Sequence, residues 1–287
     1  MFDNIYKNKT VLITGHTGFK GSWLAIWLKE LGAEVIGCAL DPPSDPNNFQ
    51  AVKLKEKITH IQGDVRNLAH LLEAFKEYQP EFIFHLAAQP LVRLSYDEPK
   101  MTFDTNVGGT VNVLEAVRLT PSVKVLVNIT RDKCYENTEW VWGYRENDPM
   151  GGHDLYSASK GCAELVFNAY LRSFFSESAA QNRVIGAASA RAGNVIGGGD
   201  WGADRFLPDC IPALSLHQPI GIRSPHAVAL AARPGTPQRL LVAWCPSFAR
   251  CGKILRRLEF RTGGQQPSDG RRNSRQAYKI LGRRFLE

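Results

Sequence analysis

The sequence lacks several features that would place it in other classes of protein. No stretch reaches about 18 consecutive apolar residues, which argues against a membrane-spanning helix. The first ten residues, MFDNIYKNKT, do not have the basic-then-apolar layout of a secretory signal. The cysteines, at positions 38, 134, 162, 210, 245 and 251, form no C-x-x-C pair and no cluster with histidine at metal-ligand spacing. We therefore predict reduced thiols, no metal site, no association with a membrane and a cytoplasmic location.

The net positive charge of the chain comes from its last fifth. The formal net charge is +7, but residues 229–287 hold 13 Lys and Arg against 3 Asp and Glu, a net of +10. The remaining 22 basic and 25 acidic residues give residues 1–228 a net charge of −3. The part before residue 229 therefore gives no indication of nucleic-acid binding.

The pattern of apolar residues predicts an α/β fold with a parallel sheet. Six apolar runs are continuous rather than alternating, as expected for strands that are buried on both faces. These runs are VLITG (11–15), VIGCAL (35–40), ITHIQG (58–63), FIFHLAA (82–88), VKVLVNIT (123–130) and RVIGAASA (183–190). Helical patterns lie between them at about 19–31, 66–77, 100–119 and 155–175. This alternation predicts a doubly wound sheet whose ligands bind at the carboxyl ends of the strands.

The turn after the first strand has the spacing of a dinucleotide-binding site. In VLITGHTGFKG, Gly15 permits a tight turn, Gly18 lets backbone N–H groups approach a diphosphate, and Gly21 lets the next helix lie close to the sheet. An ordinary strand-to-helix turn is the alternative. The preceding strand, the following helix and an acidic residue downstream favour a Rossmann-type dinucleotide site.

That acidic residue is Asp41, at the end of the second expected strand. A carboxylate there can accept hydrogen bonds from the ribose diol of adenosine, and it would repel the 2′-phosphate of NADP. The cofactor expected is therefore NAD. The alternative is an aspartate that only forms a turn before Pro42.

Tyr156 and Lys160 form a YxxxK pattern within an expected helix, so both side chains project from one face. An ammonium group near the phenol would lower the pKa of Tyr156 and allow it to take a proton from a sugar hydroxyl. By itself the pattern also fits a surface tyrosine with an unrelated lysine. After a glycine-rich turn and five strands, the catalytic interpretation is favoured.

Several segments resemble the extended short-chain dehydrogenase/reductase superfamily, namely TGHTGFKG, HLAAQPLV, TNVGGTVNVLEA and YSASK. Within it, ALDPPSDPNNF, AAQPLVRLSYDEP, DKCYEN and ARAGNVIGGGDW resemble the CDP-glucose 4,6-dehydratases. The resemblance runs from about residue 8 to Val228. It implies a Rossmann-type domain at 1–187, the start of a smaller, truncated substrate-binding portion at 188–228, and a homodimer formed through helices 100–119 and 155–175. The resemblance implies four further cofactor-binding residues, Phe19, Asp64, Ala87 and Ala88. It also implies four substrate-binding residues, Gln89, Arg131, Asn194 and Arg205.

The resemblance also implies a redox-neutral reaction. Tyr156 and Lys160 would support hydride transfer from sugar C4 to NAD, after which the C5 proton is acidic and the C6 hydroxyl can leave. Asp132 is the candidate acid for that hydroxyl, and Lys133 the candidate base for the C5 proton. Without the family resemblance, each of these features has an ordinary interpretation. Asp132 and Lys133 would be a solvated pair of loop residues, and Gly197–Gly199 would be a glycine-rich turn. Arg205 would be a surface residue beside Asp204.

The chain departs from the family at two places, at the end of the fifth strand and after Val228. Arg131 stands where the family has a small hydroxyl residue, and its longer, charged side chain is expected to crowd the hexose and impair turnover. After Val228 the family continues with a segment like RPWQHVLEPLSGYLL. One possible set of codons for that segment, read two bases later, translates as ALAARPGTPQRLL, which is residues 229–241.

We therefore interpret 229–287 as a basic, frameshifted tail of poor order, whose later composition offers little apolar surface for folding. A nucleic-acid-binding arm is the alternative, although the tail has no repeated arrangement of aromatic and basic residues. For the whole chain, the alternatives to a CDP-glucose dehydratase are an epimerase or dehydratase for another nucleotide sugar, and an inactive NAD-binding protein.

Overall fold

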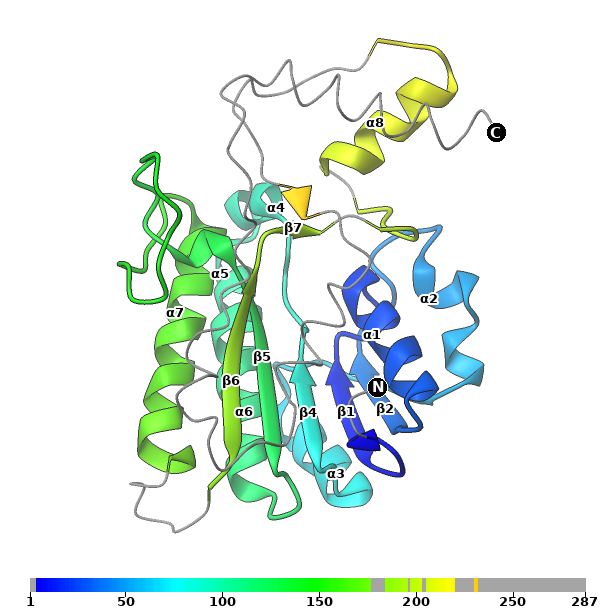
Figure 1. The fold of residues 1–287 in the computed structure, drawn as a ribbon, viewed down its shortest axis with the longest axis vertical. Coiled ribbons are helices and arrows are strands. Elements are labelled where there is room, and N and C mark those ends of the chain that lie inside the picture. Colours follow the sequence, from blue (N-terminus) through cyan, green and yellow to red (C-terminus); the bar gives the residue numbers. More distant parts are fainter. Residues whose placement is uncertain (1–3, 177–183, 196, 203–204, 220–229, 232–287) are drawn as a thin grey trace.

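The protein folds around one six-stranded parallel sheet with helices on both faces (Figure 1). The structure, a computed structural model, describes residues 4–176, 184–195, 197–202, 205–219 and 230–231. The strand order is β3-β2-β1-β4-β5-β6, and every neighbouring pair is parallel. The strands are β1 (Thr10–Thr14), β2 (Glu34–Ala39), β3 (Thr59–Gln62), β4 (Phe82–His85), β5 (Val125–Arg131) and β6 (Gly186–Ala192).

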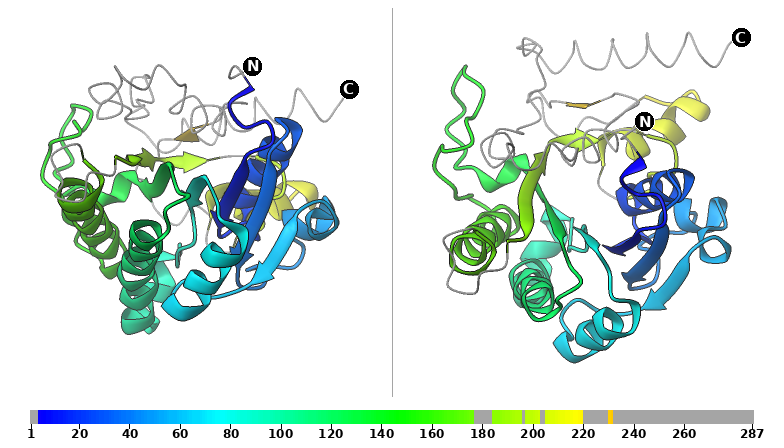
Figure 2. Two further views of the ribbon diagram at one scale, coloured as in Figure 1. Left: turned by 90° about the horizontal axis from the view of Figure 1, so that it is seen from below. Right: turned by 60° about the horizontal axis from the view of Figure 1, so that its bottom comes forward.

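Successive strand residues face opposite sides of the sheet, so the continuous apolar runs feed two separate cores. One core joins Val11 and Ile13 of β1 to Leu24 and Leu28 of α1 (Phe19–Glu30). The other core joins Leu12, also of β1, to the helices on the opposite face. Figure 2 shows these helices together on one side of the sheet, and they are α3 (Leu68–Tyr78), α6 (Gly109–Leu119) and α7 (Leu155–Tyr170).

Shorter elements complete the described chain. Between β2 and β3 lie α2 (Asn48–Ala51) and the turn η2 (Leu54–Glu56). Between β4 and β5, α4 (Val92–Asp97) precedes α5 (Pro99–Phe103) and a π-helical turn, η3 (Asp104–Gly108). A 3-10 turn, η4 (Asp132–Cys134), follows β5, and a π-helical turn, η5 (Leu171–Phe175), follows α7. Beyond β6 come β7 (Asn194–Val195), α8 (Phe206–Ser215) and β8 (Leu230–Ala231), which pairs parallel to β7.

Two helices begin in ways that matter for the site. The Asp154 carboxylate accepts a hydrogen bond from the backbone N–H of Ser157 at 2.8 Å and caps α7. Helix α1 begins after Gly18 without a side-chain cap. The first N–H groups of α1 therefore stay available to an anionic ligand.

The doubly wound parallel sheet that the sequence predicts is confirmed, and all six expected strands form within a few residues of their predicted bounds. The helix predicted at 100–119 contains a π-helical turn, η3, between α5 and α6. The predicted domain boundary after residue 187 falls within β6, and this division stays a prediction. Of the predicted tail at 229–287, the structure describes only residues 230–231.

Cys38, Cys134, Cys162 and Cys210 are free thiols, and the other two cysteines lie outside the described residues. Among the helices that the structure describes, none is both long and apolar enough to cross a membrane.

Candidate active site

A cavity of about 1100 Å³ opens at the carboxyl ends of the parallel strands. Its wall is formed by the turn after β1, the ends of β2, β4 and β5, the start of α7 and the segment after β6. This is the edge of a doubly wound sheet at which ligands are expected. The predicted site residues that line it are Gly15, Gly18, Phe19, Gly21, Asp41, Asp64, Ala87, Ala88, Arg131, Lys133, Tyr156, Lys160, Asn194 and Arg205.

The glycine-rich turn has no space for side chains at two of its three glycines. Gly15 has a φ of +77°, and a Cβ there would lie 2.7 Å from the backbone nitrogen of Ala87. A Cβ on Gly21 would lie 2.2 Å from the carbonyl oxygen of Gly15, so α1 packs directly on the turn. Together with the uncapped start of α1, this makes a backbone cradle that fits a dinucleotide diphosphate.

Two carboxylates predicted from the sequence to bind the cofactor line the cavity. Asp41 follows β2, and its Oδ2 accepts a hydrogen bond from Gln62 at 3.1 Å. Asp64, after β3, binds the guanidinium of Arg66 at 2.5 and 2.8 Å, and these bonds keep the pKa of Asp64 below its usual value against the effect of burial. Asp41 is exposed and lines the cavity, and its binding of a ribose diol stays a prediction.

Tyr156 and Lys160 come from the first two turns of α7 and are both buried, with exposed fractions of 2% and 7%. The ammonium nitrogen of Lys160 lies 5.9 Å from the centre of the Tyr156 ring. Burial, with the charges of Lys20 and Arg131, lowers the pKa of Lys160 to about 7. Part of the Lys160 population is therefore neutral at neutral pH.

The expected lowering of the Tyr156 pKa is not what the structure has. Burial raises the pKa of Tyr156, while the charge and a hydrogen bond of the Arg131 guanidinium act in the opposite direction. Lys160 supplies less positive charge than the pattern suggests, because its own ammonium is buried. The spacing in the sequence correctly predicted that a lysine lies near Tyr156. It could not show that both side chains are buried, which changes the pKa of each.

Arg131, at the end of β5, lines the cavity and contacts residues of other elements there. Its guanidinium donates a hydrogen bond to Oδ1 of Asn194, and its Nε lies 3.5 Å from Oδ1 of Asp132. That Nε is buried and donates to no acceptor in the described part of the chain. The side chain thus contacts Asn194, which the resemblance assigns to the substrate, and Tyr156, the predicted catalytic tyrosine.

Asn194 opens β7 directly after the sheet, and Arg205 stands just before α8. Arg205 is held by Asp200, whose carboxylate oxygens lie 2.9 and 3.1 Å from Nη1. Its neighbour in the sequence, Asp204, lies outside the described residues. Arg205 therefore points into the cavity from a fixed position and can contact a diphosphate.

The two predicted groups for elimination differ in placement. Asp132 and Lys133 belong to η4, and Lys133 lines the cavity, whereas Asp132 does not and has a half-exposed side chain. Gln89 also stays outside the cavity wall. Its amide is buried and bonded to Thr102 Oγ1 at 2.8 Å and to the carbonyl of Leu91 at 3.0 Å, so the structure gives it a role in folding the loop after β4.

Sequence reasoning missed one cation of the cavity, Lys20. It is the second residue of α1, inside the glycine-rich motif, and it lines the cavity. Burial and the charges of Arg131 and Arg205 lower the pKa of Lys20 to about 8. Its charge within GFKG was a visible signal, but its burial and the nearby charges of Arg131 and Arg205, which lower its pKa, arise only in the folded chain.

Comparison with known proteins gives a consistent result. The family model described as GDP-mannose 4,6 dehydratase matches residues 12–194. A CDP-glucose 4,6-dehydratase from Salmonella typhimurium is 53% identical over 225 residues, which cover 78% of this chain and 63% of the relative. The chain thus spans less than two thirds of the length of that relative.

Solved structures have the same fold. UDP-glucose 4-epimerase from Thermotoga maritima, solved with UDP-glucose, superposes with a TM-score of 0.70 at 21% identity, covering 82% of this chain and 72% of the epimerase. The dTDP-glucose 4,6-dehydratase DesIV from Streptomyces venezuelae, solved with NAD and TYD, gives 0.68 at 22% identity, covering 81% and 71%.

Proposed function

We propose, because this chain belongs to the family of the GDP-mannose 4,6 dehydratases, that its cavity binds NAD and removes water from CDP-D-glucose. The product would be CDP-4-dehydro-6-deoxy-D-glucose, which makes the enzyme a hydro-lyase. The proposal rests on one observation. The glycine cradle, the Tyr156–Lys160 pair and Lys133 in the turn after β5 all line one cavity. The 53% identity to a CDP-glucose 4,6-dehydratase supports the choice of nucleotide.

The cofactor-binding residues would be those of the glycine cradle, with Asp41 at the ribose. Gly15, Gly18 and Gly21 fit a diphosphate because the cradle has no room for a Cβ at two of these positions. When bound, NAD would accept a hydride from C4 of the hexose and return it to C6. This is why the overall reaction would need no net oxidant.

The residues of the chain would handle the protons. Tyr156, as phenolate, takes the proton of the C4 hydroxyl when that carbon is oxidised to a ketone. Lys133 takes the C5 proton, which the C4 ketone acidifies. Asp132 gives a proton to the C6 hydroxyl, so that the C6–O bond breaks, water leaves and a C5–C6 double bond forms. Its side chain is not part of the cavity wall, but its charge acts on Tyr156 and Lys20, which are, so the carboxyl has to turn toward the substrate for this step. Hydride addition at C6 and return of a proton to C5 then complete the product.

The substrate would be held through its diphosphate. Asn194 and Arg205 line the same cavity as the glycine cradle, and Lys20, on which the charge of Arg205 acts, adds a positive charge to it. Charged hydrogen bonds of this kind are the usual means of binding phosphates.

The test is to incubate the purified protein with CDP-glucose and NAD and to follow the absorbance of a 4-keto sugar in alkali. Appearance of that absorbance is the expected result, and UDP-glucose and dTDP-glucose serve as controls for the nucleotide. Absence of product with all three sugars, together with NAD binding by calorimetry, would instead support an inactive NAD-binding protein. The contact of Arg131 with Tyr156 and Asn194 favours this second candidate.

We also propose a homodimer that packs α6 and α7 against their copies, and a cytoplasmic location. The exposed Leu119 of α6 and Leu165 of α7 are consistent with a helical interface. Light scattering of the purified chain would measure the mass, and a monomer at micromolar concentration would contradict the proposal.

A further inference from the structure

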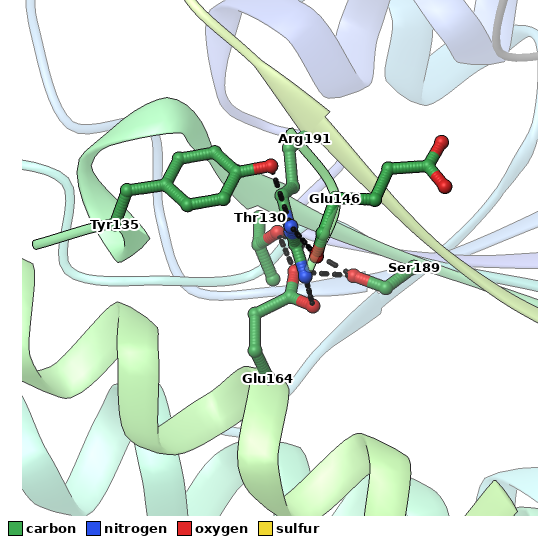
Figure 3. A network of polar contacts seen from close by, with 6 residues as sticks. All are labelled: Thr130, Tyr135, Glu146, Glu164, Ser189 and Arg191. Carbon is green, nitrogen blue, oxygen red and sulfur yellow. Dashed lines mark hydrogen bonds and ion pairs between the residues drawn. The ribbon is translucent and has the colours of Figure 1, made fainter. Parts of the chain in front are cut away.

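The turn that carries Asp132 and Lys133 is attached at both ends to one ion pair (Figure 3). Before the turn, the hydroxyl of Thr130 donates a hydrogen bond to Oε1 of Glu164. After it, the hydroxyl of Tyr135 accepts a hydrogen bond from Nη1 of Arg191 at 2.6 Å. Nη2 of Arg191 lies 2.9 Å from Oε2 of Glu164, which closes the connection.

The ion pair is buried and has its hydrogen bonds satisfied by several elements. Glu164 is 1% exposed, and the side chain of Arg191 is 12% exposed. Oε1 of Glu164 also accepts from Ser189 of β6 at 2.5 Å, and Nη1 of Arg191 also donates to the carbonyl of Glu146 at 3.1 Å. The planar guanidinium of Arg191 binds the Glu164 carboxylate and the Tyr135 hydroxyl, and it therefore holds these two groups in a defined relative orientation.

The geometry also joins the turn to the helix that carries Tyr156 and Lys160. Glu164 lies one helical turn after Lys160 and two turns after Tyr156 on α7. Between them, Gly161 lets η4 approach closely, since a Cβ there would lie 3.3 Å from the carbonyl oxygen of Cys134. Thus α7 supports the phenol and, through Glu164, the neighbouring turn.

We propose that Glu164 and Arg191 are positioning residues that hold Asp132 and Lys133 at a fixed place relative to Tyr156, and so serve the elimination step. This inference rests on the proposed dehydratase function. Neither Glu164 nor Arg191 lines the described cavity, so their effect on the substrate is exerted through the turn. A displacement of about 1 Å can cost a hundredfold in rate, so such a support has consequences for chemistry.

Two variants and a matched control test the proposal. Tyr135→Phe removes only the hydroxyl that Arg191 binds, and Glu164→Gln keeps the shape of the side chain while removing its charge. The control is Tyr144→Phe. The ring of Tyr144 stacks on Tyr135 at 5.0 Å, but its hydroxyl bonds to Thr138 and Asn137 instead of Arg191.

The first measurement is amide hydrogen exchange over residues 131–135, which needs no activity. We expect exchange in Tyr135→Phe and Glu164→Gln to be about tenfold faster than in the parent, with the control within about twofold. If Tyr135→Phe exchanges like Tyr144→Phe, the positioning role is contradicted. Tyr135→Phe keeps the ion pair, so it remains informative should Glu164→Gln fail to fold.

The second measurement separates the steps of the reaction. With CDP-glucose and NAD, the absorbance of NADH at about 340 nm follows the first hydride transfer, and incorporation of solvent deuterium at C5 follows the lysine-dependent step. Both variants are expected to slow deuterium incorporation about tenfold more than NADH formation. An equal loss in both steps would contradict the inference. If the parent shows neither signal, the proposed function fails, while the exchange measurement still decides whether the ion pair holds the turn.

Discussion

The guanidinium of Arg131 donates a hydrogen bond to the side-chain oxygen of Asn194, joining the end of β5 to β7 across the proposed sugar site. The two residues are 63 positions apart in the sequence. Because the same guanidinium also contacts the phenol of Tyr156, it links the proposed catalytic tyrosine to Asn194, the residue proposed to bind the diphosphate. This contact has consequences that can be measured.

Arg131→Thr is expected to increase turnover of CDP-glucose by about tenfold to a hundredfold, because it frees Asn194 and removes the obstruction. The loss of the guanidinium also removes a charge that lowers the pKa of Tyr156, so the pH at which activity rises should move upward. Steady-state rates across a pH series measure both effects. Unchanged activity and an unchanged pH profile would show that Arg131 does not obstruct the site.

Gly21→Ala is expected to reduce NAD affinity by about tenfold or more, because the added Cβ would lie 2.2 Å from the Gly15 carbonyl and displace the turn. Gly108→Ala is the matched control, since a Cβ at Gly108 meets no atom within 4 Å. Calorimetric titration with NAD measures the affinity, and circular dichroism verifies that each variant is folded. Equal affinities for the two variants would contradict the cradle.

Protonation of Lys160 should make stability depend on pH. Its folded-state pKa of about 7 lies below the ordinary value of 10.5, so between pH 7 and 10 the unfolded chain carries a proton that the folded chain lacks. Stability therefore rises with pH through this window, and Lys160→Met should reduce the rise. Lys20, with a pKa of about 8, will leave some slope above pH 8.

Exposed Lys29, in the last turn of α1, provides the control for that titration. Denaturant unfolding of the parent, Lys160→Met and Lys29→Met at a series of pH values gives the free energy of unfolding. The Lys29 variant is expected to follow the parent. A Lys160 variant that also follows the parent would mean that this ammonium is not depressed by burial.

The tail prediction can be tested on the gene. We expect the codons for residues 229–241, read in the frame that begins two bases earlier, to encode a segment like RPWQHVLEPLSGYLL. Sequencing the gene from independent isolates reads those codons directly. Codons that give an unrelated peptide in that frame would contradict the frameshift and favour a distinct segment after Val228.

Much of the site could be predicted from the sequence because each of its motifs lies within one turn or one helix. The spacing of Gly15, Gly18 and Gly21 forms one turn, and the YxxxK pair occupies one helical face. Buried parallel strands appear in the sequence as uninterrupted runs of apolar residues, so the positions and the carboxyl ends of the strands could be predicted as well. Gln89 shows the limit of this reasoning, since its side chain is buried in the loop after β4 and does not line the cavity.

The sequence by itself determined the doubly wound sheet, the glycine cradle and the residues that follow each strand, because these depend on spacing and on apolar periodicity. Only the tertiary structure decided the electrostatics of the cavity and the support of its turns. The pKa of Lys160 depends on burial and on Lys20 and Arg131, and the Glu164–Arg191 pair joins α7 to β6. Such contacts are made between residues distant in the chain, and their strength depends on how much water the surrounding fold excludes.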